Sequence, residues 1–325
     1  ALERLYNQTS RWGELLEVLE LRLKHGEESD VKVSLLEQMA EVFAYRLDSI
    51  GEAVECYERA LTFDAKHLAI IEKLEGLLAD MGAWQRLVEV LEHHVELIGD
   101  SDKAIQIYLR AAAIVEEELS DYLAAKKYYS RVRELESTNV IALHGLGELF
   151  ERTGEWRKAI EMLELEAAIL KENPKAVPLW VRIGEIQNDV VMDRDSAREA
   201  YAKALVIDPH CPQALKALRE VARSSEQWDV YGTYLLTELE TAQPSDDKVE
   251  LFYEAGRYYQ DVRDDEALSV RYYQQALALD EHHLRSVDAL ADIYYRSQRW
   301  EDAEELYRKV ITGLDAGKQR QLFCQ

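Results

Sequence analysis

The apolar residues of this chain recur with a helical period. In the segment 140–150, for example, Leu143, Leu146 and Phe150 are separated by three and then four residues, a spacing that places side chains on one face of an α-helix. The strict alternation of apolar and polar residues that marks a half-buried strand is not part of the pattern. We therefore predict an all-α fold.

The tryptophans show that these helices form a repeat. Five of them follow one another at intervals of 72 residues, without insertion or deletion: Trp12, Trp84, Trp156, Trp228 and Trp300. A second series keeps the same interval half a period out of phase: Tyr57, Tyr129, Tyr201 and Tyr273. Such self-similarity is the signature of a solenoid, in which each unit packs on its neighbours. Each period thus holds two helical hairpins of about 36 residues, named here the Trp hairpin and the Tyr hairpin after these series.

Residues that interrupt helices fall where this repeat needs them. Gly82 and Gly154 lie where a first helix should end, and the five prolines lie near hairpin junctions or in first turns. We count about eight and a half hairpins, beginning inside a first helix and ending as another begins at 317–325. Phe323 lies one period after Leu251, so we predict a single solenoid domain over residues 1–325 that is a fragment of a longer array.

The segment 139–174 resembles a tetratricopeptide repeat. The residues that match its large, small, aromatic, turn and alanine pattern are Leu143, Leu146, Gly147, Phe150, Gly154, Trp156 and Ala159. The resemblance covers the whole chain, and the alternation of two hairpin types is similar to long repeat arrays in proteins of myxobacteria and their relatives. It implies an open, right-handed superhelical solenoid of antiparallel helix hairpins that serves as a scaffold for protein binding.

The family pattern has a small residue at the eighth position of the first helix, and the two hairpin types differ there. The Tyr hairpins carry Ala40, Ala112, Gly184 and Gly256, whereas Trp hairpins carry Glu3, Glu75 and Arg219. How closely the helices of the Trp hairpin pack is therefore left open. We interpret the Trp series itself as structural, with each ring locking a second helix on the first, and not as a ladder that stacks bases or sugars.

Charge narrows the choice of partner. The chain has 63 Asp and Glu against 39 Lys and Arg, a formal charge of −24, with 47% hydrophobic residues. This hydrophobic content supports a folded chain, while the negative charge disfavours nucleic acid and anionic membranes as partners. No stretch is long and apolar enough to span a membrane, and the three cysteines have no short spacing. We expect a soluble, cytoplasmic protein.

The resemblance to tetratricopeptide repeats implies that the first helices line the concave face of the solenoid, and that ligands contact defined positions on these helices. The residues here at the ninth position include Glu41, Glu148, Glu185, Glu220, Arg257 and Asp292, and apolar or aromatic side chains at neighbouring positions are Leu109, Val181, Tyr253 and Tyr295. Carboxylates in one groove would attract a basic segment, and the apolar side chains would anchor an amphipathic one. The same acids would also serve simply as a solvated surface on an acidic chain.

The sequence offers little for catalysis. Histidines four residues apart on a helix, which would hold a metal, do not occur, and we expect the histidines at exposed or turn positions. Phosphate loops and nucleophile elbows are not found. We predict no cofactor, no metal and no enzymatic activity. Three alternatives remain: a regulatory or substrate-docking arm of a larger multidomain protein, a helical-toroid carbohydrate-active enzyme, and self-association through an unfilled groove.

Overall fold

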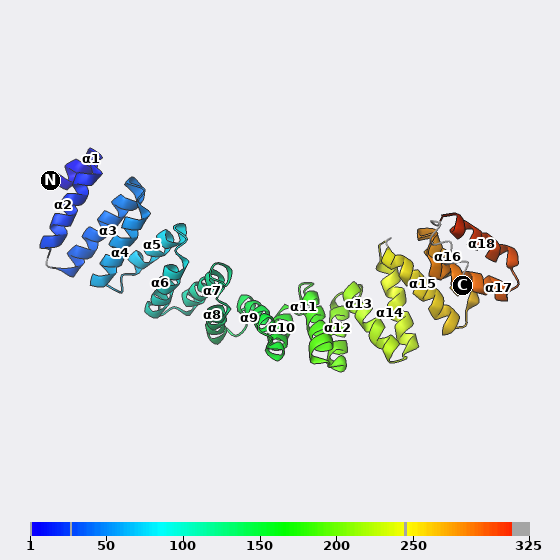
Figure 1. Cartoon of the computed structure of the whole chain (residues 1–325). Helices are drawn as coiled ribbons and strands as arrows, with labels where there is room; N and C mark the ends of the chain where they lie inside the picture. The colour runs from blue at the N-terminus through cyan, green and yellow to red at the C-terminus, as the bar shows by residue number, and fades with distance from the viewer. Residues whose placement is uncertain (1, 27, 244–245, 314–325) are drawn as a thin grey trace. The chain divides into compact units, whose positions relative to one another are not determined.

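The computed structural model describes residues 2–26, 28–243 and 246–313, which are largely helical (Figure 1). These residues form eighteen α-helices and one π-helical segment, η1 (Gln187–Val191), and no strand occurs within the described ranges. The all-α prediction is confirmed. The start of a further first helix expected at 317–325 lies outside the described residues.

The helices alternate between the first and second members of successive hairpins. The first helices are α1 (Leu2–Gln8), α3 (Ser29–Arg46), α5 (Leu68–Asp80), α7 (Ser101–Glu117), α9 (Val140–Arg152), α11 (Ala176–Ile186), α13 (Pro212–Ser224), α15 (Asp246–Asp261) and α17 (Leu284–Arg296). The second helices are α2 (Trp12–His25), α4 (Ile50–Phe63), α6 (Trp84–Leu97), α8 (Tyr122–Leu135), α10 (Trp156–Leu170), α12 (Arg194–Ile207), α14 (Trp228–Thr241), α16 (Glu266–Leu279) and α18 (Trp300–Gly313). Because α1 has only 7 residues, the predicted count of eight and a half hairpins is confirmed.

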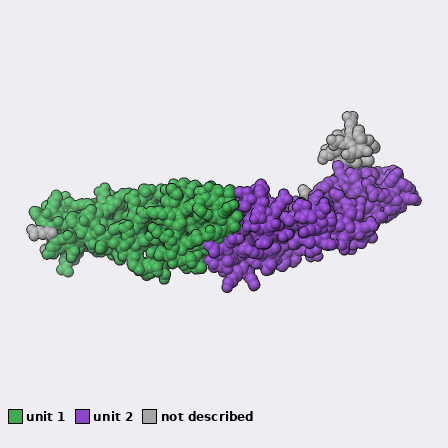
Figure 2. Space-filling model, turned by 90° about the horizontal axis from the view of Figure 1, so that it is seen from below, with its two compact units in different colours: residues 1–162 green, residues 163–325 purple. Residues whose placement is uncertain are grey.

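The chain forms two compact units, residues 1–162 and 163–325 (Figure 2). In each unit the extensive helix packing is between helices that follow one another along the chain, as expected for a repeat in which each hairpin packs on its neighbours. The core of unit 1 is built around side chains such as Leu36, Leu74 and Leu143, and that of unit 2 includes clusters around Tyr201, Leu235 and Tyr273. A single domain over residues 1–325 stays a prediction.

Each turn between the two helices of a hairpin contains a residue in the left-handed backbone conformation. In the Trp hairpins these residues are Ser10, Gly82, Gly154, Glu226 and Gln298, and in the Tyr hairpins they are Asp48, Ser120, Met192 and Asp264. Glycine adopts this conformation without steric cost, unlike residues with a Cβ. Glycine therefore marks the turn in the sequence only at Gly82 and Gly154, although all nine of these turns have the left-handed residue.

The two helices of the Tyr hairpins pack more extensively than those of the Trp hairpins, among hairpins that lie within one unit. In two Tyr hairpins the second helix approaches the eighth position closely, because a Cβ on Gly184 would lie 2.6 Å from the ring of Tyr201, and one on Gly256 would lie 2.5 Å from Tyr273. The tyrosine thus packs directly on the first helix. At the same position of the Trp hairpins, Gly147 and Ala291 are also small, whereas Glu75 and Arg219 are charged and buried.

Candidate functional site

First helices lie beside first helices within each unit, and second beside second. In unit 1, Lys73 of α5 donates to Glu37 and Glu41 of α3 at 2.8 Å. On the other side of the hairpins, Lys127 of α8 lies 3.2 Å from Glu92 of α6. Each unit therefore has a first-helix face and a second-helix face, and the candidate residues from the sequence all belong to first helices.

In unit 1 the eighth position of a Trp hairpin holds a buried ionic cluster. Glu75 and His94 are each 6% exposed, with His94 Nδ1 2.5 Å from Glu75 Oε1. Arg110 of the next first helix donates to the other carboxylate oxygen at 3.0 Å. A buried charge is tolerated only when paired in this way. The expectation that histidines lie at exposed or turn positions is wrong for His94, because its ring is buried between the helices where it pairs with Glu75.

In unit 2 the same repeat position has the opposite charge. Arg219 donates to Glu238 at 2.9 Å and to Glu254, which also accepts a hydrogen bond from Tyr231 at 3.2 Å. Burial raises the pKa of Glu238 more than Arg219 lowers it, and burial first, then the charge of Glu254, raises the pKa of Tyr231 to about 12. One cation here holds two carboxylates, where in unit 1 one carboxylate holds a histidine and an arginine.

The sequence contains a signal for these clusters, because their members keep fixed spacings along the chain. The second member of each cluster lies 19 residues after the first, as in Glu75 with His94 and Arg219 with Glu238. The third lies 35 residues after the first. In each case polar residues of opposite or complementary charge stand at these intervals, a signal that reading the eighth position by size alone overlooks.

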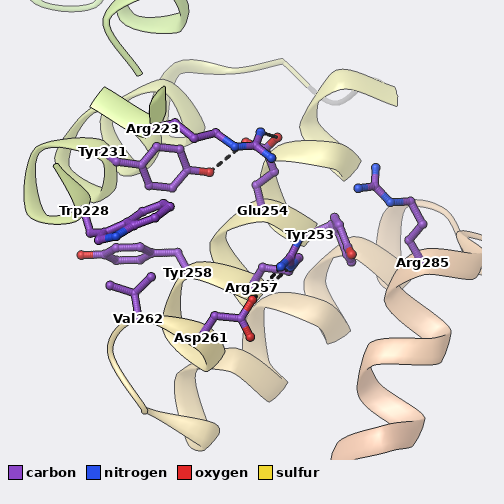
Figure 3. Close-up of a pocket in the computed structure, with 10 residues that line it drawn as sticks. All are labelled: Arg223, Trp228, Tyr231, Tyr253, Glu254, Arg257, Tyr258, Asp261, Val262 and Arg285. Carbon is purple, nitrogen blue, oxygen red and sulfur yellow. Dashed lines mark hydrogen bonds and ion pairs between the residues drawn. The ribbon is translucent and has the colours of Figure 1, made fainter. Parts of the chain in front are cut away.

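A pocket of about 560 Å³ opens beside the Arg219 cluster on the first-helix face of unit 2 (Figure 3). We call it the Trp228 pocket. Its aromatic side chains are Trp228, Tyr231, Tyr253 and Tyr258. Trp228 is 40% exposed and its ring centroid lies 5.9 Å from that of Tyr231, which lies 5.9 Å from that of Tyr258. Gly232 leaves room for Tyr258, because a Cβ there would overlap its ring.

Two carboxylates in the wall of the Trp228 pocket are already engaged. Glu254 accepts from buried Arg219 and from the Tyr231 hydroxyl. Asp261 accepts from Arg257 Nε at 3.2 Å and from Nη2 at 2.8 Å. The negative charges of the wall are thereby offset by contacts within the protein.

The three arginines of the Trp228 pocket are Arg223, Arg257 and Arg285, and each side chain is about half exposed. Arg285 lies 4.3 Å from the centre of the Tyr253 ring and donates to Glu250 at 2.8 Å. A guanidinium has five N–H donors, so these contacts leave donors that can face a ligand.

A second pocket, of about 770 Å³, also belongs to the first-helix face of unit 2. We call it the Val181 pocket. Apolar side chains of Val177, Val181 and Ile207 line it together with Glu185 and the start of α13. Because α13 contributes Pro212 to this pocket and its far end to the Trp228 pocket, the two lie about 16 Å apart along that helix at 1.5 Å per residue.

The structure places the ten predicted residues in different settings. Tyr253 and Arg257 line the Trp228 pocket, Val181 and Glu185 line the Val181 pocket, and Glu41 lines a pocket of about 350 Å³ in unit 1. Leu109 is half-buried against the core of unit 1, Tyr295 is 64% exposed with its ring 4.6 Å from Trp300, and Glu148, Glu220 and Asp292 are exposed.

The carboxylates Glu148, Glu185 and Glu220, expected to act together in one groove, do not all keep their full field. Glu148 belongs to unit 1 and lies 3.7 Å from His144, whereas Glu185 and Glu220 belong to unit 2. Glu185 pairs with Arg182 at 3.0 Å, and Glu220 lies 3.7 Å from Arg219. These two arginines weaken the field that Glu185 and Glu220 present to a partner.

Trp228 is a site residue that the sequence reasoning missed. The Trp series was interpreted as structural, and Trp12 and Trp84 do pack against the core of unit 1. Trp228 instead exposes its ring in a pocket. Regular spacing located the ring at the start of a second helix, but it gave no information on how far the neighbouring side chains cover it.

Within the ranges that the structure describes, His, Cys, Asp and Glu side chains do not come together in groups of three that could hold a metal ion. None of the described helices is long and apolar enough to cross a membrane.

Comparison with known proteins matches two segments, 142–176 and 286–321, to a family model described as tetratricopeptide repeat. No curated protein matches the sequence. Among similar solved structures, the C-terminal part of a TPR repeat-containing protein from Cytophaga hutchinsonii is 16% identical with a TM-score of 0.47, over 78% of this chain and 98% of that one. YrrB, described as a TPR protein with an unusual peptide-binding site, is 17% identical with a TM-score of 0.40, over 58% and 96%. The pilF protein of Pseudomonas aeruginosa is 14% identical with a TM-score of 0.38, over 69% and 97%. At these values the likenesses do not bear on the partner.

Proposed function

We propose that this chain, a repeat protein of the tetratricopeptide superfamily, is a non-catalytic scaffold that binds a segment of a partner protein on the first-helix face of unit 2. The observation that carries the proposal is the Trp228 pocket, which brings the predicted residues Tyr253 and Arg257 together with an exposed tryptophan. Exposed aromatic and arginine side chains in one concavity are the composition of interaction hot spots.

An amphipathic segment fits this face better than a uniformly charged one. The Val181 pocket offers Val177, Val181 and Ile207 to an apolar side chain, and the Trp228 pocket lies about 16 Å further along α13. An extended chain covers about 3.3 Å per residue, so roughly five residues would join the two pockets. The basic segment suggested by the acids of the first helices stays a weaker proposal, because the two acids of unit 2, Glu185 and Glu220, each have an arginine beside them.

Site-specific photo-crosslinking in the native cell tests the proposal. A photoreactive amino acid replaces exposed Arg257 on the first-helix face, and in a matched variant it replaces exposed Arg271 on second helix α16. We expect a discrete protein adduct at position 257 that is missing at position 271 and is reduced by Tyr253→Ala. The same adducts at both positions, or none at position 257, would contradict a partner on this face.

An adduct at position 257 whose mass is twice that of the chain would identify a second copy as the occupant. An adduct with a catalytic protein, or with a domain encoded on the same gene, would favour the alternative of a docking arm.

A further inference from the structure

We propose that the Trp228 pocket selects an acidic segment: a stretch of a partner protein in which a large apolar or aromatic side chain is flanked by Asp or Glu. This inference rests on the proposed function and names the chemistry of its partner. It departs from the basic partner that the overall charge of the chain favours, because the groups that this pocket exposes differ from the average of the surface.

The apolar part of the segment is specified by the aromatic wall. Trp228 is exposed, and Tyr231 and Tyr258 adjoin it in a connected group of rings. In Figure 3 the rings of Trp228, Tyr231 and Tyr258 all lie at the side of the pocket away from Arg285. A flat or bulky side chain packed on such rings buries a large apolar area, and edge or offset contacts between rings add to that.

The charged part follows from which groups remain accessible. Glu254 is mostly covered and satisfied by Arg219 and Tyr231, and Asp261 is held by both Nε and Nη2 of Arg257. A basic side chain entering the pocket would therefore meet carboxylates that already have an arginine beside them, and the like charge of that arginine would oppose its approach.

An acidic side chain would also approach arginines that have a carboxylate beside them, but the lining of the pocket holds three arginines and only two carboxylates, Glu254 and Asp261. Arg223, Arg257 and Arg285 come from three first helices, α13, α15 and α17, and their half-exposed guanidinium groups surround the pocket. Arg223 lies 3.8 Å from Glu254, beyond hydrogen-bond distance. Arginine binds carboxylates through paired N–H donors, so a segment with two carboxylates near its anchor would use donors that are free at present.

The test selects short random peptides displayed on phage against the whole chain. A counter-selection uses the variant Arg223→Gln, Arg257→Gln, Arg285→Gln, and Arg271→Gln on α16 is the matched control, since it neutralises an exposed arginine outside the pocket. Circular dichroism verifies that the variants keep their helices. If the triple variant does not fold, Arg285→Gln alone replaces it, because that side chain is more than half exposed.

We expect the selected peptides to carry Asp or Glu beside an aromatic or large aliphatic residue. Their affinity should fall about tenfold in the triple variant, as expected for lost charge-assisted contacts, and should stay unchanged in Arg271→Gln. Trp228→Ala should weaken the same peptides. Selected peptides rich in Lys and Arg that still depend on Trp228 would overturn the acidic inference and leave the scaffold proposal standing. Peptides that ignore all these substitutions, or no selected peptides, would count against the pocket and, with a negative crosslink at position 257, against the proposed function.

Discussion

Units 1 and 2 each have a pocket at the same point of the repeat, three 72-residue periods apart. In unit 1 it lies beside Trp12 and is about 350 Å³, and in unit 2 it lies beside Trp228 and is about 560 Å³. Both are formed by the first helix and tryptophan of a Trp hairpin with the following first helix. The fold therefore fixes where the cavity lies, because the left-handed turn and the tryptophan recur at the same positions.

The side chains that line the two pockets, and those directly behind the lining, differ in size and in charge. The corresponding pairs, with the unit 1 residue first, are Glu3 and Arg219, Leu16 and Gly232, Gln38 and Glu254, Glu41 and Arg257, and Val42 and Tyr258. The change from leucine to glycine makes room for the change from valine to tyrosine. A few residue exchanges at fixed positions of the repeat therefore convert one cavity into another with different binding chemistry.

The largest expected effect is a loss of stability when the charged residue at the base of a pocket is replaced, and it should differ between the two units. Arg219→Leu should destabilise unit 2 by about 3 kcal/mol, because it leaves Glu238 and Glu254 without their buried cation. Glu3→Ala should cost less than about 1 kcal/mol, because its pair with Arg22 at 2.6 Å is solvent-exposed. Hydrogen exchange of α13 to α15 and of α1 to α3 reads the two losses separately, which matters because a repeat array need not unfold in one step.

The prediction is contradicted if Arg219→Leu and Glu3→Ala lose similar stability, each below about 1 kcal/mol. Burial would then not distinguish the two pockets. Glu238→Gln serves as a milder control, because the pKa of Glu238 is raised by burial and a neutral amide keeps the hydrogen-bonding shape of the side chain.

A smaller effect concerns the helix that forms the far wall of each pocket. Gly256→Ala should destabilise unit 2 by about 1 kcal/mol, since overpacking against Tyr273 costs roughly 1–3 kcal/mol and alanine regains about 1 kcal/mol in helix propensity. Unit 1 already has Ala40 at this position, fully buried beside Tyr57. Thermal unfolding followed by circular dichroism measures the change. A stabilised Gly256→Ala variant would show that α15 and α16 approach no more closely than α3 and α4.

The fold of both pockets could be predicted from the sequence because apolar period, tryptophan spacing and turn position all repeat. The position of a residue on a first helix was likewise enough to single out Tyr253 and Arg257. What the sequence did not reveal depends on neighbours in space. The exposure of Trp228 follows from the side chains around it, and the buried charges at the eighth position depend on partners 19 and 35 residues away.

The smallest expected effect is the change in binding affinity when acidic residues of the first helices in unit 2 are replaced by lysine. Glu185→Lys together with Glu220→Lys should change the affinity for a cationic segment by about fivefold, since two exposed ion pairs at roughly 0.5 kcal/mol each amount to about 1 kcal/mol. The same substitutions with Glu148→Lys, in unit 1, should add nothing for a segment that binds only unit 2. Pull-down of the crosslinked partner, repeated from about 0.05 to 0.3 M salt, measures both. A loss well above tenfold, with a steep salt dependence that the substitutions abolish, would restore the basic partner and make the acidic run, and not the Trp228 pocket, the determinant of binding.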